Sequence, residues 1–363
     1  MNTTRKLHAL GQSLWLDNIS RPLLDNGTLA RYIKDFSITG LTSNPTIFEQ
    51  AIGQSDSYDA DIARKTGEGK SGEALFFELA LDDLRRAADL FRPVFDATGG
   101  VDGWASLEVS PLLANDAQKT IAAAAHLHSL AGRPNIYIKI PGTPEGTVAI
   151  EESIFAGVPI NVTLLFSCAQ YQAAAEACLR GIERRLAAGL SPKVPSVASL
   201  FVSRWDVAAN KALPTHLHNQ LGLAVAAQTY AAYRALLASA RWQKLAAAGA
   251  SVQRLLWAST GTKDPSAPDT LYLDALAAPD TINTIPDKTL LAFADHGQAH
   301  QTLADDASSA AATLAACSKA GIDTDALAQQ LQREGAASFA KSWKSLLDNL
   351  ADKAHALAKK AAP

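Results

Sequence analysis

Cysteine is scarce in this sequence. Its 363 residues include three cysteines, Cys168, Cys178 and Cys317. Their spacing fits neither a metal-binding motif nor the disulfide framework of a small secreted protein. We therefore expect buried thiols in a reducing compartment, and we expect neither a metal nor another cofactor.

Long apolar runs are missing as well. No window holds the roughly 18 consecutive apolar residues that a membrane-spanning helix requires. The N-terminal stretch MNTTRKLHALGQSLWLDN has basic residues but no continuous apolar segment behind them, which argues against a secretory signal. The sequence predicts a soluble, cytoplasmic protein that has no membrane partner.

Neither sign of charge dominates. There are 33 Lys and Arg residues against 36 Asp and Glu residues, with a formal net charge of -3, and the two signs are interspersed. A nucleic-acid backbone would require a basic stripe, which this sequence lacks. We expect small-molecule partners, no nucleic acid, and a monomer or homodimer.

What the sequence does contain is an alternation of short β-type runs and long alanine-rich helical stretches. Such alternation indicates a parallel sheet with right-handed crossovers. The expected strands are Leu14–Asp17, Ile38–Ser43, Trp104–Val109, Ile136–Pro141, Pro159–Phe166, Ser196–Val202, Leu255–Ser259 and Thr281–Ile285.

Eight such strands predict an α/β fold, a single (β/α)₈ TIM barrel that spans residues 1–363 as one domain. Residues after about 290 should be mainly helical, and we expect additional C-terminal helices packed on the outside of the barrel. A doubly wound open sheet is the competing architecture. It is disfavoured because no glycine fingerprint follows the first strand.

Polar residues recur at one phase of these strands. Side chains of a strand alternate between its two faces. In IYIKI the isoleucines suit the helix-covered face, so Tyr137 and Lys139 should point into the barrel. The same reasoning points Ile160, Val162 and Leu164 outward, and it gives Trp15 and Trp257 an inward phase. It also turns further polar residues inward: Asp17, Ser106, Glu108, Asn161 and Thr163, with Thr42 and Asn44 sharing one phase.

A lysine within an isoleucine run has three readings. It can form a buried ion pair, extend to the surface, or act as a nucleophile. Burial favours the neutral amine that attacks a carbonyl. Because several neighbouring strands supply inward polar groups, we favour an iminium on Lys139, with Asp17 and Glu108 as acid–base groups.

Three segments resemble the transaldolase family in order and spacing, across nearly the whole chain. They are GLTSNPTIF, YIKIPGTPEG with its continuation GVPINVTLLFS, and VASLFVSRWD; WASLEVSP and LLWASTGTKDP support them. The resemblance implies a barrel enzyme of the pentose phosphate pathway. It would move a dihydroxyacetone unit from sedoheptulose 7-phosphate to glyceraldehyde 3-phosphate, giving erythrose 4-phosphate and fructose 6-phosphate.

The resemblance also implies residue roles. Lys139 would bear the covalent intermediate, Asp17 would be the base for carbon–carbon cleavage, and Glu108 would shuttle protons with a water held by Thr163. The residues implied in substrate binding are Asn44 and Asn161 for the hydroxyls, Thr42, Ser106 and Ser199 as lining, Phe201 as a pocket wall, and Arg204 for the phosphate.

One position departs from the family pattern. Many members have a second arginine two residues beyond the serine equivalent to Ser259, whereas this sequence has Gly261. Lys263 could replace the missing charge, so Ser259 and Lys263 join the expected phosphate-binding residues. This variation resembles the longer bacterial branch of the family.

Two other functions remain open on sequence alone. A lyase of the fructose-6-phosphate aldolase type would use the same lysine chemistry and release dihydroxyacetone. A non-catalytic phosphosugar-binding barrel would have no need of a desolvated lysine beside two carboxylates, so we consider it the weaker alternative.

Overall fold

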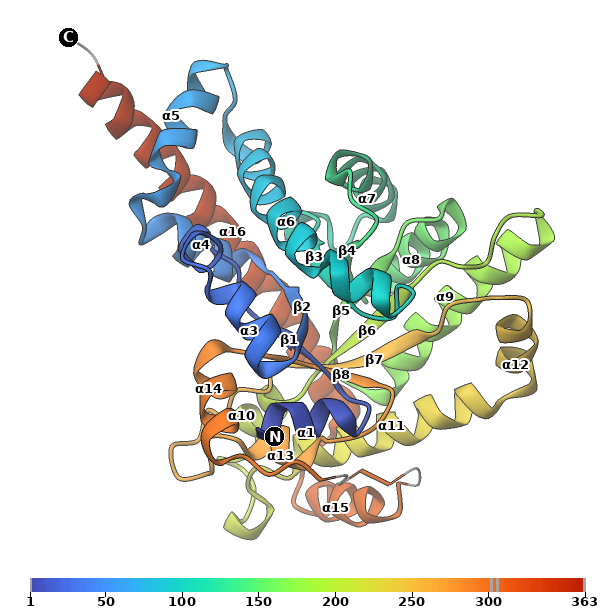
Figure 1. The fold of residues 1–363 in the computed structure, drawn as a ribbon. Coiled ribbons are helices and arrows are strands. Elements are labelled where there is room, and N and C mark those ends of the chain that lie inside the picture. The colour runs from blue at the N-terminus through green and yellow to red at the C-terminus, as the bar shows by residue number, and fades with distance from the viewer. Residues whose placement is uncertain (1, 301–302, 305–306, 362–363) are drawn as a thin grey trace.

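The computed structural model describes residues 2–300, 303–304 and 307–361. Its eight strands form one closed barrel in the order of the sequence, and all neighbours are parallel (Figure 1). The predicted (β/α)₈ fold is therefore confirmed. The strands are β1 (Ser13–Leu16), β2 (Ile38–Thr42), β3 (Trp104–Glu108), β4 (Ile136–Pro141), β5 (Ile160–Leu165), β6 (Ser196–Phe201), β7 (Gln253–Ala258) and β8 (Thr281–Ile285).

Helices surround the barrel and continue beyond its last strand (Figure 1). The α-helices are α1 (Thr3–Ala9), α2 (Arg21–Asp25), α3 (Thr28–Phe36), α4 (Pro45–Gly53), α5 (Asp59–Gly67), α6 (Gly72–Ala97), α7 (Ala117–Ala131), α8 (Pro144–Ala156), α9 (Cys168–Ala187), α10 (Ser203–Ala209), α11 (Leu221–Ala238), α12 (Ala240–Ala247), α13 (Leu271–Ala275), α14 (Asp287–His296), α15 (Ser308–Lys319) and α16 (Thr324–Ala361). Short 3-10 turns are η1 (Asp56–Tyr58), η2 (Pro111–Leu113) and η3 (Thr215–Leu217). None of the helices described is long and apolar enough to cross a bilayer.

Side-chain caps fix how the chain turns from strand to helix at the C-terminal end of the barrel. Asn44 accepts a hydrogen bond from the Ile47 amide at the start of α4, and Thr143 does the same at the start of α8. Ser167 and Gln170 form a reciprocal capping box at the start of α9. Each cap is worth about 1 kcal/mol, and together they hold the strand-to-helix connections in place.

Two apolar layers follow from the alternation of strand side chains. The outer layer, between strands and helices, contains Ile138 and Ile140 of β4. The inner layer contains Tyr137, stacked on Trp104 with ring centroids 4.0 Å apart. The predicted orientation of β4 is therefore confirmed, and Lys139 follows Tyr137 on the inward face.

Two orientation predictions were wrong. Leu164 packs with the inner cluster, because its φ of 58° and a register shift after Val162 reverse the alternation; Leu165 then returns to the outer layer. Trp257 also belongs to the outer layer. The run LLWA is apolar on both faces, so no polar residue of that run marks its phase.

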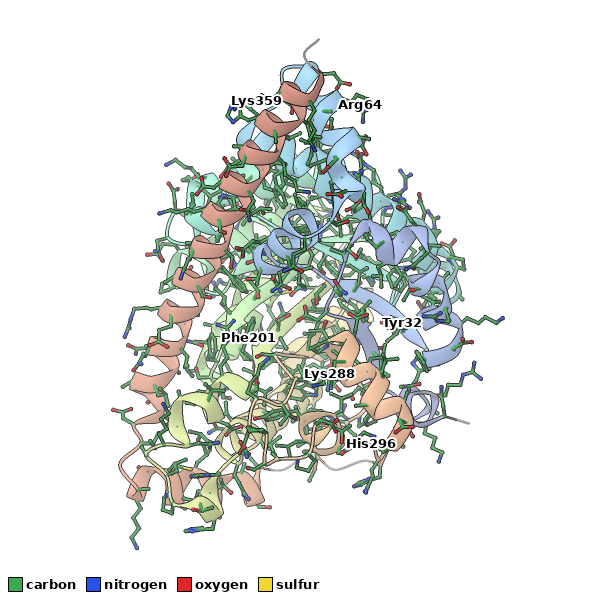
Figure 2. All side chains as sticks on the ribbon, turned by 90° about the vertical axis from the view of Figure 1, so that its left-hand side faces the viewer. Tyr32, Arg64, Phe201, Lys288, His296 and Lys359 are labelled. Atoms are coloured by element: carbon green, nitrogen blue, oxygen red, sulfur yellow. The ribbon has the colours of Figure 1, made fainter. Side chains whose placement is uncertain are left out.

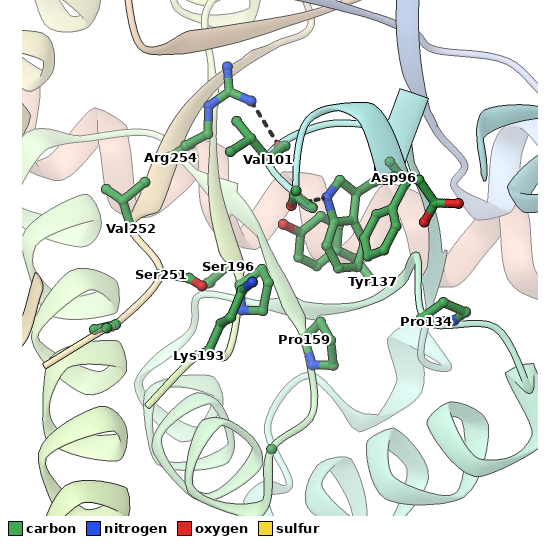
Figure 3. A pocket seen from close by; sticks show the side chains of 18 of the residues that line it. Asp96, Val101, Pro134, Tyr137, Pro159, Lys193, Ser196, Ser251, Val252 and Arg254 are labelled. Carbon is green, nitrogen blue, oxygen red and sulfur yellow. Dashed lines mark hydrogen bonds between the residues drawn. The ribbon is translucent and has the colours of Figure 1, made fainter. Parts of the chain in front are cut away.

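A cavity of about 850 Å³ lies at the N-terminal ends of the strands, on the side of the barrel away from the capped strand-to-helix connections (Figure 3). Trp104 and Tyr137 line it, and Arg254 reaches across the barrel floor. The Arg254 guanidinium lies 3.3 Å from Asp102 and donates to the Ser13 hydroxyl at 2.7 Å. Trp15 points inward as predicted, and its indole N–H donates to Asp102 on this floor at 3.1 Å.

Candidate active site

A second cavity, of about 720 Å³, lies at the C-terminal ends of the strands. Catalytic residues of barrel enzymes gather at that end. Ten of the residues singled out from the sequence line it: Asp17, Thr42, Asn44, Lys139, Thr163, Ser199, Phe201, Arg204, Ser259 and Lys263. The remaining three, Ser106, Glu108 and Asn161, are buried in the strands around it.

The centre of the site is a buried lysine–carboxylate pair. Lys139 of β4 and Glu108 of β3 are register partners, and each is 5% exposed. The Lys139 Nζ lies 3.2 Å from Glu108 Oε2 and donates to the Ser43 carbonyl at 3.0 Å. Burial raises the pKa of Glu108, although the nearby lysine opposes that shift. A carboxyl that binds a proton readily beside an amine is suited to exchange protons with it.

A second carboxylate approaches the lysine from the end of β1. Asp17 Oδ1 accepts a hydrogen bond of 2.8 Å from Thr42, whose hydroxyl also contacts that of Thr284 at 2.6 Å. Burial raises the pKa of Asp17, while the charges of Lys139 and Lys263 and the Thr42 hydrogen bond act in the opposite direction. The two carboxylates thus face one amine from different strands, as two separate proton transfers would require.

Hydroxyl and amide groups form a hydrogen-bonded row beside Lys139. Asn161 donates to the Ser106 hydroxyl at 3.2 Å and accepts from Ser199 at 2.7 Å. Thr163, farther along β5, has a fully buried hydroxyl with no hydrogen-bond partner among the described residues. An unsatisfied buried polar group costs about 1–3 kcal/mol, so this hydroxyl is suited to hold a water or a substrate group.

Cationic groups gather at the other side of the cavity. The Arg204 side chain starts from α10, and its guanidinium carbon lies 5.2 Å from the Phe201 ring centroid. Ser259, with a φ of 55°, brings its hydroxyl within 2.9 Å of that of Ser203. Lys263 Nζ lies only 3.9 Å from the position that a Cβ on Gly261 would occupy. The charge of Lys263 therefore reaches the space beside the residue that departs from the family pattern.

Several lining residues escaped the sequence reasoning, and two of them are Thr284 and Phe339. Thr284 of β8 lies beside Thr42, but TINTI has polar residues on both faces, and its phase was therefore ambiguous. Phe339 lies 53 positions after Pro286, the preceding residue that lines the cavity, and it belongs to helix α16, which we expected on the outside of the barrel. No strand alternation could identify it.

Comparisons with known proteins agree with this geometry. Residues 14–350 match the family described as Transaldolase/Fructose-6-phosphate aldolase. The chain is 44% identical over 355 residues to a transaldolase of Thiobacillus denitrificans, covering 96% of this chain and 99% of that protein. It is also 44% identical over 356 residues to a transaldolase of Thermobifida fusca, covering 96% and 97%. The chain belongs to the transaldolase/fructose-6-phosphate aldolase family.

Proposed function

We propose that this protein is a transaldolase, a transferase of the pentose phosphate pathway. It would take a dihydroxyacetone unit from sedoheptulose 7-phosphate and pass it to glyceraldehyde 3-phosphate, which yields erythrose 4-phosphate and fructose 6-phosphate. The observation that carries the proposal is the buried Lys139–Glu108 pair, 3.2 Å apart beside Asp17 in a cavity lined with hydroxyl and cationic groups.

The first half of the reaction forms the iminium. The neutral amine of Lys139 adds to the ketose carbonyl, and the resulting carbinolamine loses its hydroxyl as water. Glu108 supplies the proton for that departure, through a water bound by the unpartnered Thr163 hydroxyl. Burial raises the pKa of Glu108, and a carboxyl that holds its proton more tightly than usual supports this role as a proton donor.

The second half breaks and remakes a carbon–carbon bond. Asp17 takes the proton from the hydroxyl next to the scissile bond, and the aldehyde leaves while the bonding electrons move into the iminium. The three-carbon unit stays on Lys139 as an enamine. It then attacks the acceptor aldehyde, Asp17 returns the proton, and water releases the ketose product.

The other polar residues hold the substrate. Asn44 and Asn161 bind hydroxyls of the three-carbon unit, Thr42, Ser106 and Ser199 complete its surroundings, and Phe201 forms a wall. Arg204, Ser259 and Lys263 bind the phosphate, since charge-assisted contacts are the strong ones for a dianion. The position of Lys263 beside Gly261 supports a lysine in place of the missing arginine.

An acceptor-dependence assay tests this function. Fructose 6-phosphate is supplied with and without erythrose 4-phosphate, and sedoheptulose 7-phosphate and free dihydroxyacetone are both measured. A transaldolase should form sedoheptulose 7-phosphate at a rate well above that of dihydroxyacetone release. Equal release of dihydroxyacetone without acceptor would instead indicate an aldolase-type lyase, and no turnover would indicate a phosphosugar-binding barrel.

A further inference from the structure

Helix α16 takes part in the active-site cavity. It runs along one side of the molecule (Figure 2) and packs against α4, α6 and β5 at the C-terminal end of the barrel. Its Phe339 is buried and lines the cavity. The helix is therefore more than an outer layer, because it supplies part of the cavity wall.

The aromatic ring of Phe339 faces the guanidinium of Arg204. The Arg204 guanidinium carbon lies 5.9 Å from the Phe339 ring centroid and 5.2 Å from that of Phe201. Among the described residues, no carboxylate forms an ion pair with Arg204. Ring faces attract a guanidinium within about 6 Å, and they leave its N–H groups free for an anion. The rings of Phe201 (β6) and Phe339 (α16) thus hold the Arg204 guanidinium in position.

Two further contacts fix α16 close to the site. Gln332 donates hydrogen bonds of 2.9 Å to the carbonyls of Gly142 and Leu164, which adjoin the C-terminal ends of β4 and β5. Gly335 lies where a Cβ would come within 2.9 Å of Leu164 Cδ2 and 3.4 Å of Arg204 Nη1. Glycine within a helix costs about 1 kcal/mol relative to alanine. The close approach explains why glycine occupies this position.

We propose that Phe339 is a positioning residue for Arg204, so that α16 determines how well the enzyme binds the phosphate of its substrates. The inference rests on the proposed function, in which Arg204 binds that phosphate. Loss of the Phe339 ring should free the guanidinium to adopt other rotamers. The substrate would then bind more weakly, while the chemistry at Lys139 would be unchanged once the substrate is bound.

Steady-state kinetics with fructose 6-phosphate as the varied donor test this proposal. We expect Phe339→Ala to raise KM roughly tenfold, the size of a partly desolvated cation–π contact, with kcat within about twofold of the parent. Phe339→Tyr should restore the parent KM. Phe339→Leu, which keeps bulk but removes the ring face, should not. Ser338→Ala, an exposed neighbour on the same helix, is the matched control.

A double variant separates this inference from the proposed function. In an Arg204→Ala background, adding Phe339→Ala should raise KM no further, because the ring acts through the guanidinium. If Arg204→Ala raises KM but Phe339→Ala and Phe339→Leu do not, the positioning role is wrong and the phosphate assignment stands. If Arg204→Ala leaves KM unchanged, the phosphate assignment itself fails. Gly335→Ala is a second variant that should fold, because alanine favours a helix more than glycine does. It should also raise KM, because the added Cβ would crowd the Arg204 guanidinium.

Discussion

At the scale of single residues, the two carboxylates around Lys139 are expected to act at different steps. Asp17→Ala should form the Schiff base and then stall before carbon–carbon cleavage, so an unreacted donor adduct should accumulate. Glu108→Ala should slow adduct formation, because the carbinolamine lacks its proton source. Borohydride trapping over time measures both rates. Adduct formation at the parent rate in both variants would contradict this division of roles.

The phosphate side makes a separate prediction for Lys263. Lys263→Ala should raise KM for fructose 6-phosphate several-fold and leave kcat nearly unchanged, because the charge lies beside Gly261 and Lys263 is assigned to the phosphate and to no proton transfer. Lys319→Ala, on α15, is a control that removes a lysine outside the cavity. A parent-like KM in Lys263→Ala would show that Lys263 does not bind the phosphate, and that Arg204, Ser259 and backbone amides bind it instead.

The raised pKa of Asp17 predicts a pH-dependent cost in stability. Burial raises the pKa of Asp17 above the usual value of 3.8 for an aspartate, so the folded protein binds the proton more tightly than the unfolded chain. This carboxyl therefore lowers stability as pH rises from the unfolded towards the folded pKa. Asp17→Asn should gain stability relative to the parent as pH rises above about 4, and the gain should level off above the folded-state pKa. A thermal-unfolding difference that is independent of pH would contradict this expectation.

At the scale of elements, strand boundaries were predictable where the residues were apolar. Strand β4, for example, begins and ends at the predicted residues. Strand β7 begins two residues before the predicted Leu255, because Gln253 and Arg254 are buried in the ladder although they are polar. Arg254 could be recognised as buried only with its partner Asp102, which lies 152 positions away in the sequence.

A glycine in β2 shows how one strand accommodates its neighbours. A Cβ on Gly40 would lie 2.7 Å from the Trp15 indole and 2.8 Å from the Trp104 carbonyl. Gly40→Ala should lower the free energy of unfolding by about 1–3 kcal/mol through overpacking. Chemical denaturation measures this change. Gly67→Ala, where a Cβ would have open space, should be close to neutral, and equal losses in both variants would refute the packing argument.

At the scale of the whole molecule, the site was more predictable than the path of the C-terminal helix. Strand alternation brings inward residues together in a closed barrel, so Lys139, Asp17 and Glu108 could be grouped from the sequence. Alternation says nothing about where a helix packs. The apolar positions of α16 indicate a buried face but do not name the surface that it covers, and Phe339 could therefore not be assigned to the cavity.

The central claim is that Lys139 carries the covalent intermediate. The protein is incubated with fructose 6-phosphate, reduced with borohydride, digested and analysed by mass spectrometry. The account predicts one adduct, on Lys139, and none in a folded Lys139→Arg variant, because guanidinium stays protonated and cannot form the imine. An adduct on another lysine, or a Lys139→Arg enzyme with parent activity, would contradict it.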